Sequence, residues 1–213
     1  MNNIYILNDK SIEGVENIPL IKIIYLKNKI DIKNYDALIF TSKNGIYSLN
    51  SFNQDWKNIP SYVISNKTKE VLLKIGGKLK FTGKSNNGDD FANELIDILS
   101  NKQVLYIRSE KILSNITNIL KKNDININEL ITYKTICNKT PNTIKIPPSN
   151  SIIIFSSPST INCFFNIYKW NYTYKAIVIG ETTASYMQKY ISNYDVSEEL
   201  SIESCIKKAK DYI

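Results

Sequence analysis

The sequence predicts an α/β fold of two similar lobes, each with a parallel sheet flanked by helices. Three observations support this prediction: an internal repeat, alternating strand-like and helix-like segments, and a length of 213 residues, which suits two domains of roughly 100 residues each. The repeat joins residues 39–42 (IFTS) to 154–157 (IFSS), and 63–68 (VISNKT) to 178–183 (VIGETT). Both offsets are 115 residues (154 − 39 = 178 − 63 = 115). Because no gap separates the two matched blocks, we predict two copies of one strand–helix unit.

The elements follow in chain order from apolar spacing and from the residues that bound each run. Before the second copy, the pattern predicts strands at 4–7, 21–26, 38–40, 62–64, 79–81, 104–107 and 127–136, and helices at 45–52, 67–75, 89–99 and 112–120. The helix at 67–75 should end at Gly76, because glycine readily adopts the left-handed conformation. After a proline-rich break at 141–148, the pattern predicts strands at 152–155, 176–179 and 194–196, and helices at 160–168, 183–190 and 198–210. Such alternation favours parallel sheets with helices on both faces.

A weaker similarity predicts how the lobes are assembled from the chain. Residues 4–10 resemble residues 104–111, so the N-terminal strand should complete the lobe built from the second copy. We therefore expect a discontinuous lobe at 1–24 plus 140–213, an inserted lobe at 32–131, and a two-stranded hinge at about 25–31 and 132–139. A ligand cleft is expected between the two lobes.

Composition limits the partners. The net charge of +7 suits nucleic acid, an anionic membrane surface or an acidic small molecule. The lysines are scattered and no nucleic-acid-binding signature is present, so we expect no nucleic acid. No apolar run approaches the roughly 18 residues of a membrane span, and the first residues do not resemble a signal peptide. We therefore expect a cytoplasmic protein without membrane contact, in which Cys137, Cys163 and Cys205 are reduced structural thiols.

The absence of histidine excludes several kinds of site. Ser-His and Cys-His nucleophiles and histidine metal sites are ruled out. The glycine-rich nucleotide motifs are also missing from a chain with 7 glycines. Any chemistry must therefore use carboxylates, hydroxyls, phenols, amines or backbone dipoles, and we expect no metal and no cofactor.

The repeated hydroxyl clusters are the first candidates for a site. They lie where four predicted helices begin: Thr41 and Ser42, residues 66–68, residues 157–160, and Thr182 with Thr183. A helix start offers free backbone N–H groups that bind anions. The same side chains also serve as ordinary helix caps, so both interpretations remain open.

Three further side chains are candidates on position and chemistry. Tyr133 lies in the second crossing segment, where a protonated phenol with a pKa of roughly 10 is a possible proton donor or positioning group. Arg108, the only arginine, follows a predicted strand and suits either a substrate carboxylate or an ion pair with Glu110. Lys175 is a possible carboxylate partner with the same ambiguity.

An ordered set of segments resembles the uroporphyrinogen-III synthase family over essentially the whole chain. The set comprises residues 35–42 (YDALIFTS), 104–110 (VLYIRSE), 131–135 (ITYKT), 154–159 (IFSSPS) and 176–184 (AIVIGETTA). The resemblance implies two α/β lobes joined by a two-stranded ladder. It also implies a lyase, a monomer in our expectation, that cyclises and dehydrates hydroxymethylbilane with inversion of ring D. The family reaction passes through a spirocyclic intermediate and uses no metal or organic cofactor.

The resemblance also implies roles for individual residues. It makes Tyr133 the catalytic tyrosine of the cleft, and the matched positions predict substrate contacts at Ser42, Thr68, Ser157, Ser159, Thr183 and Lys175. Their neighbours in the hydroxyl clusters and the lone arginine complete the predicted set: Thr41, Thr182 and Arg108, with Asn44 standing where some members of the family have a basic residue. Other departures from the family pattern are Ser65, Ser109 and Glu181, where glycine, glycine and proline are common.

A second class of function fits the same pattern. A non-enzymatic two-lobe binder or sensor that closes on a small anionic ligand would have the same cleft, and it would tolerate any capping residues at the helix starts.

Overall fold

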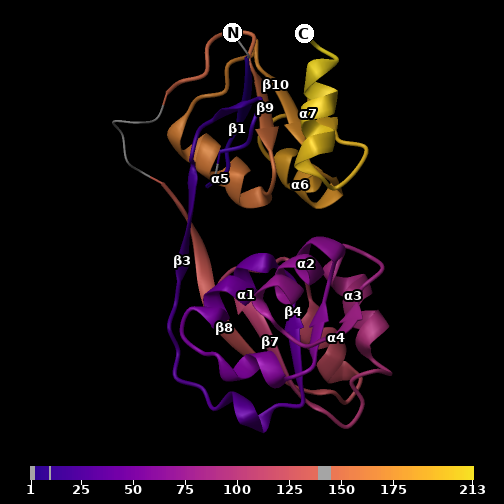
Figure 1. Cartoon of the computed structure of the whole chain (residues 1–213). Helices are drawn as coiled ribbons and strands as arrows, with labels where there is room; N and C mark the ends of the chain where they lie inside the picture. Colours follow the sequence, from indigo (N-terminus) through magenta and orange to yellow (C-terminus); the bar gives the residue numbers. More distant parts are fainter. Residues whose placement is uncertain (1–2, 10, 139–144) are drawn as a thin grey trace. The chain divides into compact units, whose positions relative to one another are not determined.

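The computed structural model describes residues 3–9, 11–138 and 145–213 (Figure 1). The chain divides into two compact units, Met1–Lys22 with Thr135–Ile213, and Ile23–Lys134. The second unit is therefore a continuous segment inserted into the first. Residues 139–144 lie outside the described residues. They include the last residue of the expected hinge, the start of the expected lobe at 140 and the first half of the predicted break at 141–148.

The inserted unit is built on a sheet of order β3-β8-β7-β4-β5-β6. The pairings from β8 through β7, β4 and β5 to β6 are all parallel. The strands are β3 (Ile21–Tyr25), β4 (Ala37–Phe40), β5 (Ser61–Val63), β6 (Leu79–Thr82), β7 (Gln103–Ser109) and β8 (Asn126–Cys137). The helices are α1 (Lys43–Asn50), α2 (Asn66–Ile75), α3 (Gly88–Leu95) and α4 (Ile116–Lys122).

Strand alternation gives this sheet two buried faces. Phe40 and Ile107 point to the face covered by α1 and α2, where Trp56 is also buried. Ile39 and Tyr106 point to the opposite face, which α3 and α4 cover. Because both faces are apolar, the polar side chains collect where the strands end.

The other unit has a five-stranded sheet of order β11-β10-β9-β1-β2, again with parallel pairings. Its strands are β1 (Ile4–Ile6), β2 (Glu16–Asn17), β9 (Ile152–Phe155), β10 (Lys175–Val178) and β11 (Asp195–Val196). Helices α5 (Pro158–Ile167) and α6 (Glu181–Met187) pack on one face, and α7 (Ile202–Lys210) packs on the other. The predicted pairing of the N-terminal strand with the second copy is confirmed, because β1 lies beside β9 as β7 lies beside β4.

The sequence repeat corresponds to equivalent helix starts. Ser42 and Ser157 cap α1 and α5, and Ser65 and Gly180 precede α2 and α6. Both pairs keep the offset of the repeat (157 − 42 = 180 − 65 = 115). A Cβ atom at Gly180 would meet the end of the Leu200 side chain.

Two predicted helices begin later than expected. The helix predicted from 112 begins at Ile116, and the helix predicted from 198 begins at Ile202. In the second case the side chain of Ser201 accepts a hydrogen bond from the backbone N–H of Ser204, so a capping residue fixes the start. The predicted end of the helix at 67–75 is confirmed, since Gly76 has a φ of 91°.

The cysteines depart from the expectation of reduced thiols. Cys137, the last residue of β8, forms a disulfide with Cys163 of α5, and their Cα atoms are 5.2 Å apart. The prediction was wrong because 26 residues separate the two cysteines in sequence, and only the fold brings them together. Cys205 of α7 is buried on the other face of the five-stranded sheet from Cys163.

We expect thiol titration to detect this disulfide. Denatured protein kept free of reductant should show one reactive thiol (3 − 2 = 1), and reduced protein should show three. Closing a loop of 26 residues stabilises the fold by about 3 kcal/mol through the unfolded chain, so reduction should also lower the melting temperature. Three thiols without reductant and an unchanged melting temperature would contradict the assignment.

The buried tyrosines of the inserted unit predict loss of stability at alkaline pH. Burial raises the pKa of Tyr62 and of Tyr106. Above a pH of about 10 the unfolded phenols ionise first, so the folded state binds more protons and the free energy of unfolding falls as pH rises. Urea unfolding from neutral pH to above 10 should show this decline. Tyr106→Phe should flatten it, whereas Tyr172→Phe, at a side chain that is 97% exposed, should leave it unchanged.

Candidate active site

The carboxyl edge of the inserted sheet gathers several predicted residues around the start of α1. Thr41 and Ser42 follow β4 directly, and the Ser42 hydroxyl accepts a hydrogen bond from the Asn44 backbone N–H at 3.2 Å. Ser42 is therefore the cap of α1. The helix start exposes its remaining N–H groups at the same edge.

Tyr133 comes to this helix start from β8. Its side chain is 7% exposed and hydrogen bonds to Ser42. Burial raises the pKa of Tyr133, while the Ser42 bond acts in the opposite direction. The preceding residue is anchored as well, because the Ser48 hydroxyl of α1 donates to Thr132 at 2.6 Å. Two consecutive residues of β8 thus bond α1, and the phenol stays in its protonated form.

A second tyrosine at this edge was not among the predicted site residues. The hydroxyl of Tyr106 lies 3.0 Å from the hydroxyl of Thr41 and also hydrogen bonds to Ser114. Its sequence signal is weak, because a tyrosine inside an apolar strand is usually a packing residue. Only the register, which places Tyr106 beside Ile39, shows that its ring points toward Thr41.

Arg108 forms an ion pair, but not with the predicted partner. Its guanidinium donates to the Glu129 carboxylate at 2.9 Å, and the Glu110 contact is to the backbone carbonyl at 3.1 Å. The expectation of a Glu110 ion pair was wrong because Glu129 lies on the neighbouring strand β8, which sequence distance hides. Thr117 and Arg108 hold the pKa of Glu129 below its usual value in spite of burial.

The start of α2 supplies a further hydroxyl pair. Ser65 caps the helix, and its hydroxyl lies 3.2 Å from that of Thr68. Thr68 is buried at 4% exposure, so its hydroxyl serves the cap. The free N–H groups of this helix start remain the feature that can bind an anion.

The carboxyl edge of the other sheet presents the equivalent helix starts. Ser157 forms a capping box with Thr160 at the start of α5, and the partly exposed Ser159 lies in the first turn. Thr182 is exposed and Thr183 is buried in the first turn of α6, which follows Gly180 without a side-chain cap. These residues follow β9 and β10, as predicted from the repeat.

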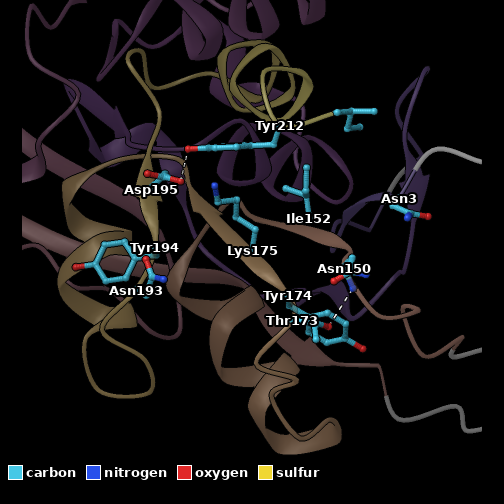
Figure 2. Close-up of a pocket in the computed structure, with 11 residues that line it drawn as sticks. Asn3, Asn150, Ile152, Thr173, Tyr174, Lys175, Asn193, Tyr194, Asp195 and Tyr212 are labelled. Carbon is cyan, nitrogen blue, oxygen red and sulfur yellow. Dashed lines mark hydrogen bonds between the residues drawn. The ribbon is translucent and has the colours of Figure 1, made fainter.

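Lys175 is the predicted residue that the structure separates from the others of its unit. It is the first residue of β10 and lies at the amino edge of the sheet, as do Ile152 and Asp195 at the starts of β9 and β11. Figure 2 shows these residues around a cavity of about 510 Å³. The Lys175 ammonium lies 3.0 Å from the centre of the Tyr212 ring, and the Tyr212 hydroxyl donates to Asp195 at 2.7 Å.

Each carboxyl edge offers hydroxyls and helix N-termini, and the edge of the inserted unit also offers a phenol. Within residues 3–9, 11–138 and 145–213, no group of three or more potential metal ligands is found. In the same described ranges, no helix is long and apolar enough to cross a membrane. Such a set of groups can bind an anionic molecule and move a proton.

Comparisons with known proteins agree with this chemistry. A family model described as uroporphyrinogen-III synthase HemD matches residues 9–207. Among solved structures, uroporphyrinogen-III synthetase from Helicobacter pylori 26695 is 27% identical, with 100% of both chains covered and a TM-score of 0.87. A mutant uroporphyrinogen III synthase from the extremely thermophilic bacterium Thermus thermophilus is 12% identical over 100% of this chain and 98% of that one, with a TM-score of 0.59, which supports the fold alone. The curated proteins gave no match.

The family model covers all but the first eight and the last six residues (9 − 1 = 8; 213 − 207 = 6). The whole inserted unit, strands β9 and β10, and the helix starts at both carboxyl edges therefore lie inside the matched region. The chain belongs to the uroporphyrinogen-III synthase family.

Proposed function

We propose that the protein converts hydroxymethylbilane to uroporphyrinogen III, with the carboxyl edges of its sheets binding the substrate and Tyr133 donating a proton. Family membership supports the reaction, and the likeness to the Helicobacter pylori enzyme along its whole length supports it further. The observation that carries the role of Tyr133 is its buried phenol, bonded to Ser42 at the start of α1.

The substrate's charge fits the groups at these edges. Hydroxymethylbilane carries eight carboxylates, and the protein has a net charge of +7. Helix N-termini stabilise anions through free N–H groups and the helix dipole. We assign the carboxylates to the starts of α1, α2, α5 and α6. The contacting side chains are the exposed or partly exposed Thr41, Ser42, Asn44, Ser157, Ser159 and Thr182, while the buried Thr68 and Thr183 support the helix starts. Lys175, at the amino edge of its sheet, is not in this set.

Arg108 lies near the carboxyl end of β7, where its guanidinium is already engaged. Its guanidinium already bonds Glu129 and the carbonyl oxygens of Ser109 and Glu110. A substrate carboxylate would have to share this arginine with Glu129. We therefore propose that Arg108 contributes positive potential, while the helix starts form the direct contacts.

The chemical step needs only a weak acid. The terminal hydroxyl leaves as water after it accepts a proton, and the electron-rich pyrrole stabilises the resulting cation. Because burial raises the pKa of Tyr133, its phenol remains protonated at neutral pH and available as the donor. A protonated carboxyl group of the substrate that passes its proton through water can replace it at a lower rate.

The choice of isomer is a matter of geometry. Direct closure of the cation gives the unrearranged type I ring, whereas attack at the substituted carbon of ring D gives the spirocyclic intermediate and then type III. Holding the reacting carbons in one orientation favours the second route. The protein therefore needs many weak contacts along the substrate more than it needs one strong catalytic group.

We further propose a monomer in the cytoplasm that binds neither nucleic acid nor membranes. The scattered lysines and the helix lengths support this proposal. The Cys137–Cys163 disulfide is unusual for that compartment, where thiols are kept reduced. Trapping the thiols during cell lysis would show which state the protein has in the cell.

The product isomer is the direct test of the function. We expect purified protein with hydroxymethylbilane to yield the type III isomer faster than the substrate cyclises in buffer, as measured by chromatography of the oxidised porphyrins. A product that is entirely type I, formed at the buffer rate, would refute the proposal.

Replacing Tyr133 should slow the reaction without abolishing it. Loss of a positioned proton donor costs on the order of 100-fold in rate. The residual turnover of Tyr133→Phe then depends on proton transfer through water from the substrate. Tyr62→Phe removes a hydroxyl from another buried tyrosine of the same unit and should leave turnover near that of wild type. Undiminished turnover of Tyr133→Phe would remove this residue from the mechanism.

A further inference from the structure

Tyr106 is a buried phenol with no role in substrate contact or in the proposed proton transfer. Its side chain is fully buried, so it does not contact the substrate. Its hydroxyl nevertheless reaches the carboxyl edge, where it bonds Thr41 at 3.0 Å and also bonds Ser114. These bonds join the end of β4 to the segment before α4.

Strand register explains why the ring reaches that edge. Tyr106 pairs with Ile39, and Thr41 follows Ile39 by two residues. Residues two apart in a strand point to the same face, and diagonal neighbours on one face lie within reach of a long aromatic side chain. The Tyr106 hydroxyl therefore meets the side chain of the residue just before the α1 cap.

The other unit shows that the fold does not require a tyrosine at this position. Ile6 pairs with Ile154 as Tyr106 pairs with Ile39, and residues 39 and 154 are equivalent in the repeat (154 − 39 = 115). An isoleucine completes that sheet, so volume and burial alone do not account for the phenol. Tyr133 likewise belongs to the inserted unit, and Tyr106 lies near enough to it to contribute to the raised pKa of the Tyr133 phenol.

We propose that Tyr106 is a positioning residue for the reaction. By bonding Thr41 and Ser114, it holds the turn after β4 in place. Ser42, which follows Thr41, bonds the Tyr133 hydroxyl from that turn. This inference rests on the proposed function and deepens it. Tyr106 acts through Thr41 on the orientation of the donor, while Tyr133 delivers the proton.

The test compares the removal of either end of the Tyr106–Thr41 bond. Tyr106→Phe and Thr41→Val each keep the shape of the side chain and delete its hydroxyl. We expect each to lower kcat for type III formation about five- to tenfold, with KM within about twofold of wild type. Because both remove the same bond, the double variant should be no slower than the slower single variant.

Two controls separate positioning from packing. Thr41→Ser keeps the hydroxyl and should have a higher kcat than Thr41→Val. Tyr62→Phe removes a hydroxyl from the same apolar cluster and should retain a kcat near that of wild type. If Tyr106→Phe does not fold, the contrast between Thr41→Val and Thr41→Ser measures the same bond.

The outcomes distinguish this inference from the function beneath it. Turnover of Tyr106→Phe equal to that of Tyr62→Phe, with type III still formed by wild type, overturns the positioning role and leaves the synthase activity intact. Rate losses that multiply in the double variant overturn it as well. Type I product alone from wild type refutes the proposed function itself.

Discussion

The parallel direction of the strands is the constraint on which the rest of the structure depends. Apart from β3, which pairs with β8 in the antiparallel direction, the strands of each sheet deliver their carboxyl ends to one edge, and each of β4, β5, β9 and β10 is followed at once by a helix. Both faces of the sheets are buried under helices, so polar chemistry is confined to the edges. Helix starts need caps, and Ser42, Ser65 and Ser157 provide them. The same geometry that satisfies the backbone therefore builds a surface suited to a polyanionic substrate.

The reaction does not need a strongly acidic or basic side chain at the reacting carbon. A hydroxyl that leaves an electron-rich pyrrole needs a modest proton donor, and a phenol kept neutral by burial meets that need. The cost of burying Tyr133 is offset by its bond to Ser42 and by the neighbouring bond between Ser48 and Thr132. Each of these bonds joins β8 to the start or first turns of α1. The hydroxyls that stabilise this position are therefore the same ones that orient the proton donor in our proposal.

The two copies of the repeat have diverged in what they contribute. The inserted unit carries Tyr106 and Tyr133 at its edge, whereas the other unit has Ile6 in the place of Tyr106. Gly180 stands in the second copy where the first has Ser65. Both units thus keep the paired helix starts of the repeat, while the phenols belong to one.

Apart from the short strand β2, the sequence by itself determined the order and type of the strands and α-helices, the repeat and its helix caps, and the family. These features are local: apolar period, glycine and serine punctuation, and fixed offsets along the chain define them without reference to distant residues. The tertiary structure alone decided the pairs between distant residues. The Cys137–Cys163 disulfide, the Arg108–Glu129 ion pair and the bond between Tyr106 and Thr41 each join positions far apart in sequence. Lys175 lies at the amino edge for the same reason, since only strand direction shows which end of β10 it occupies. Register and packing create such contacts, and a one-dimensional pattern carries no record of them.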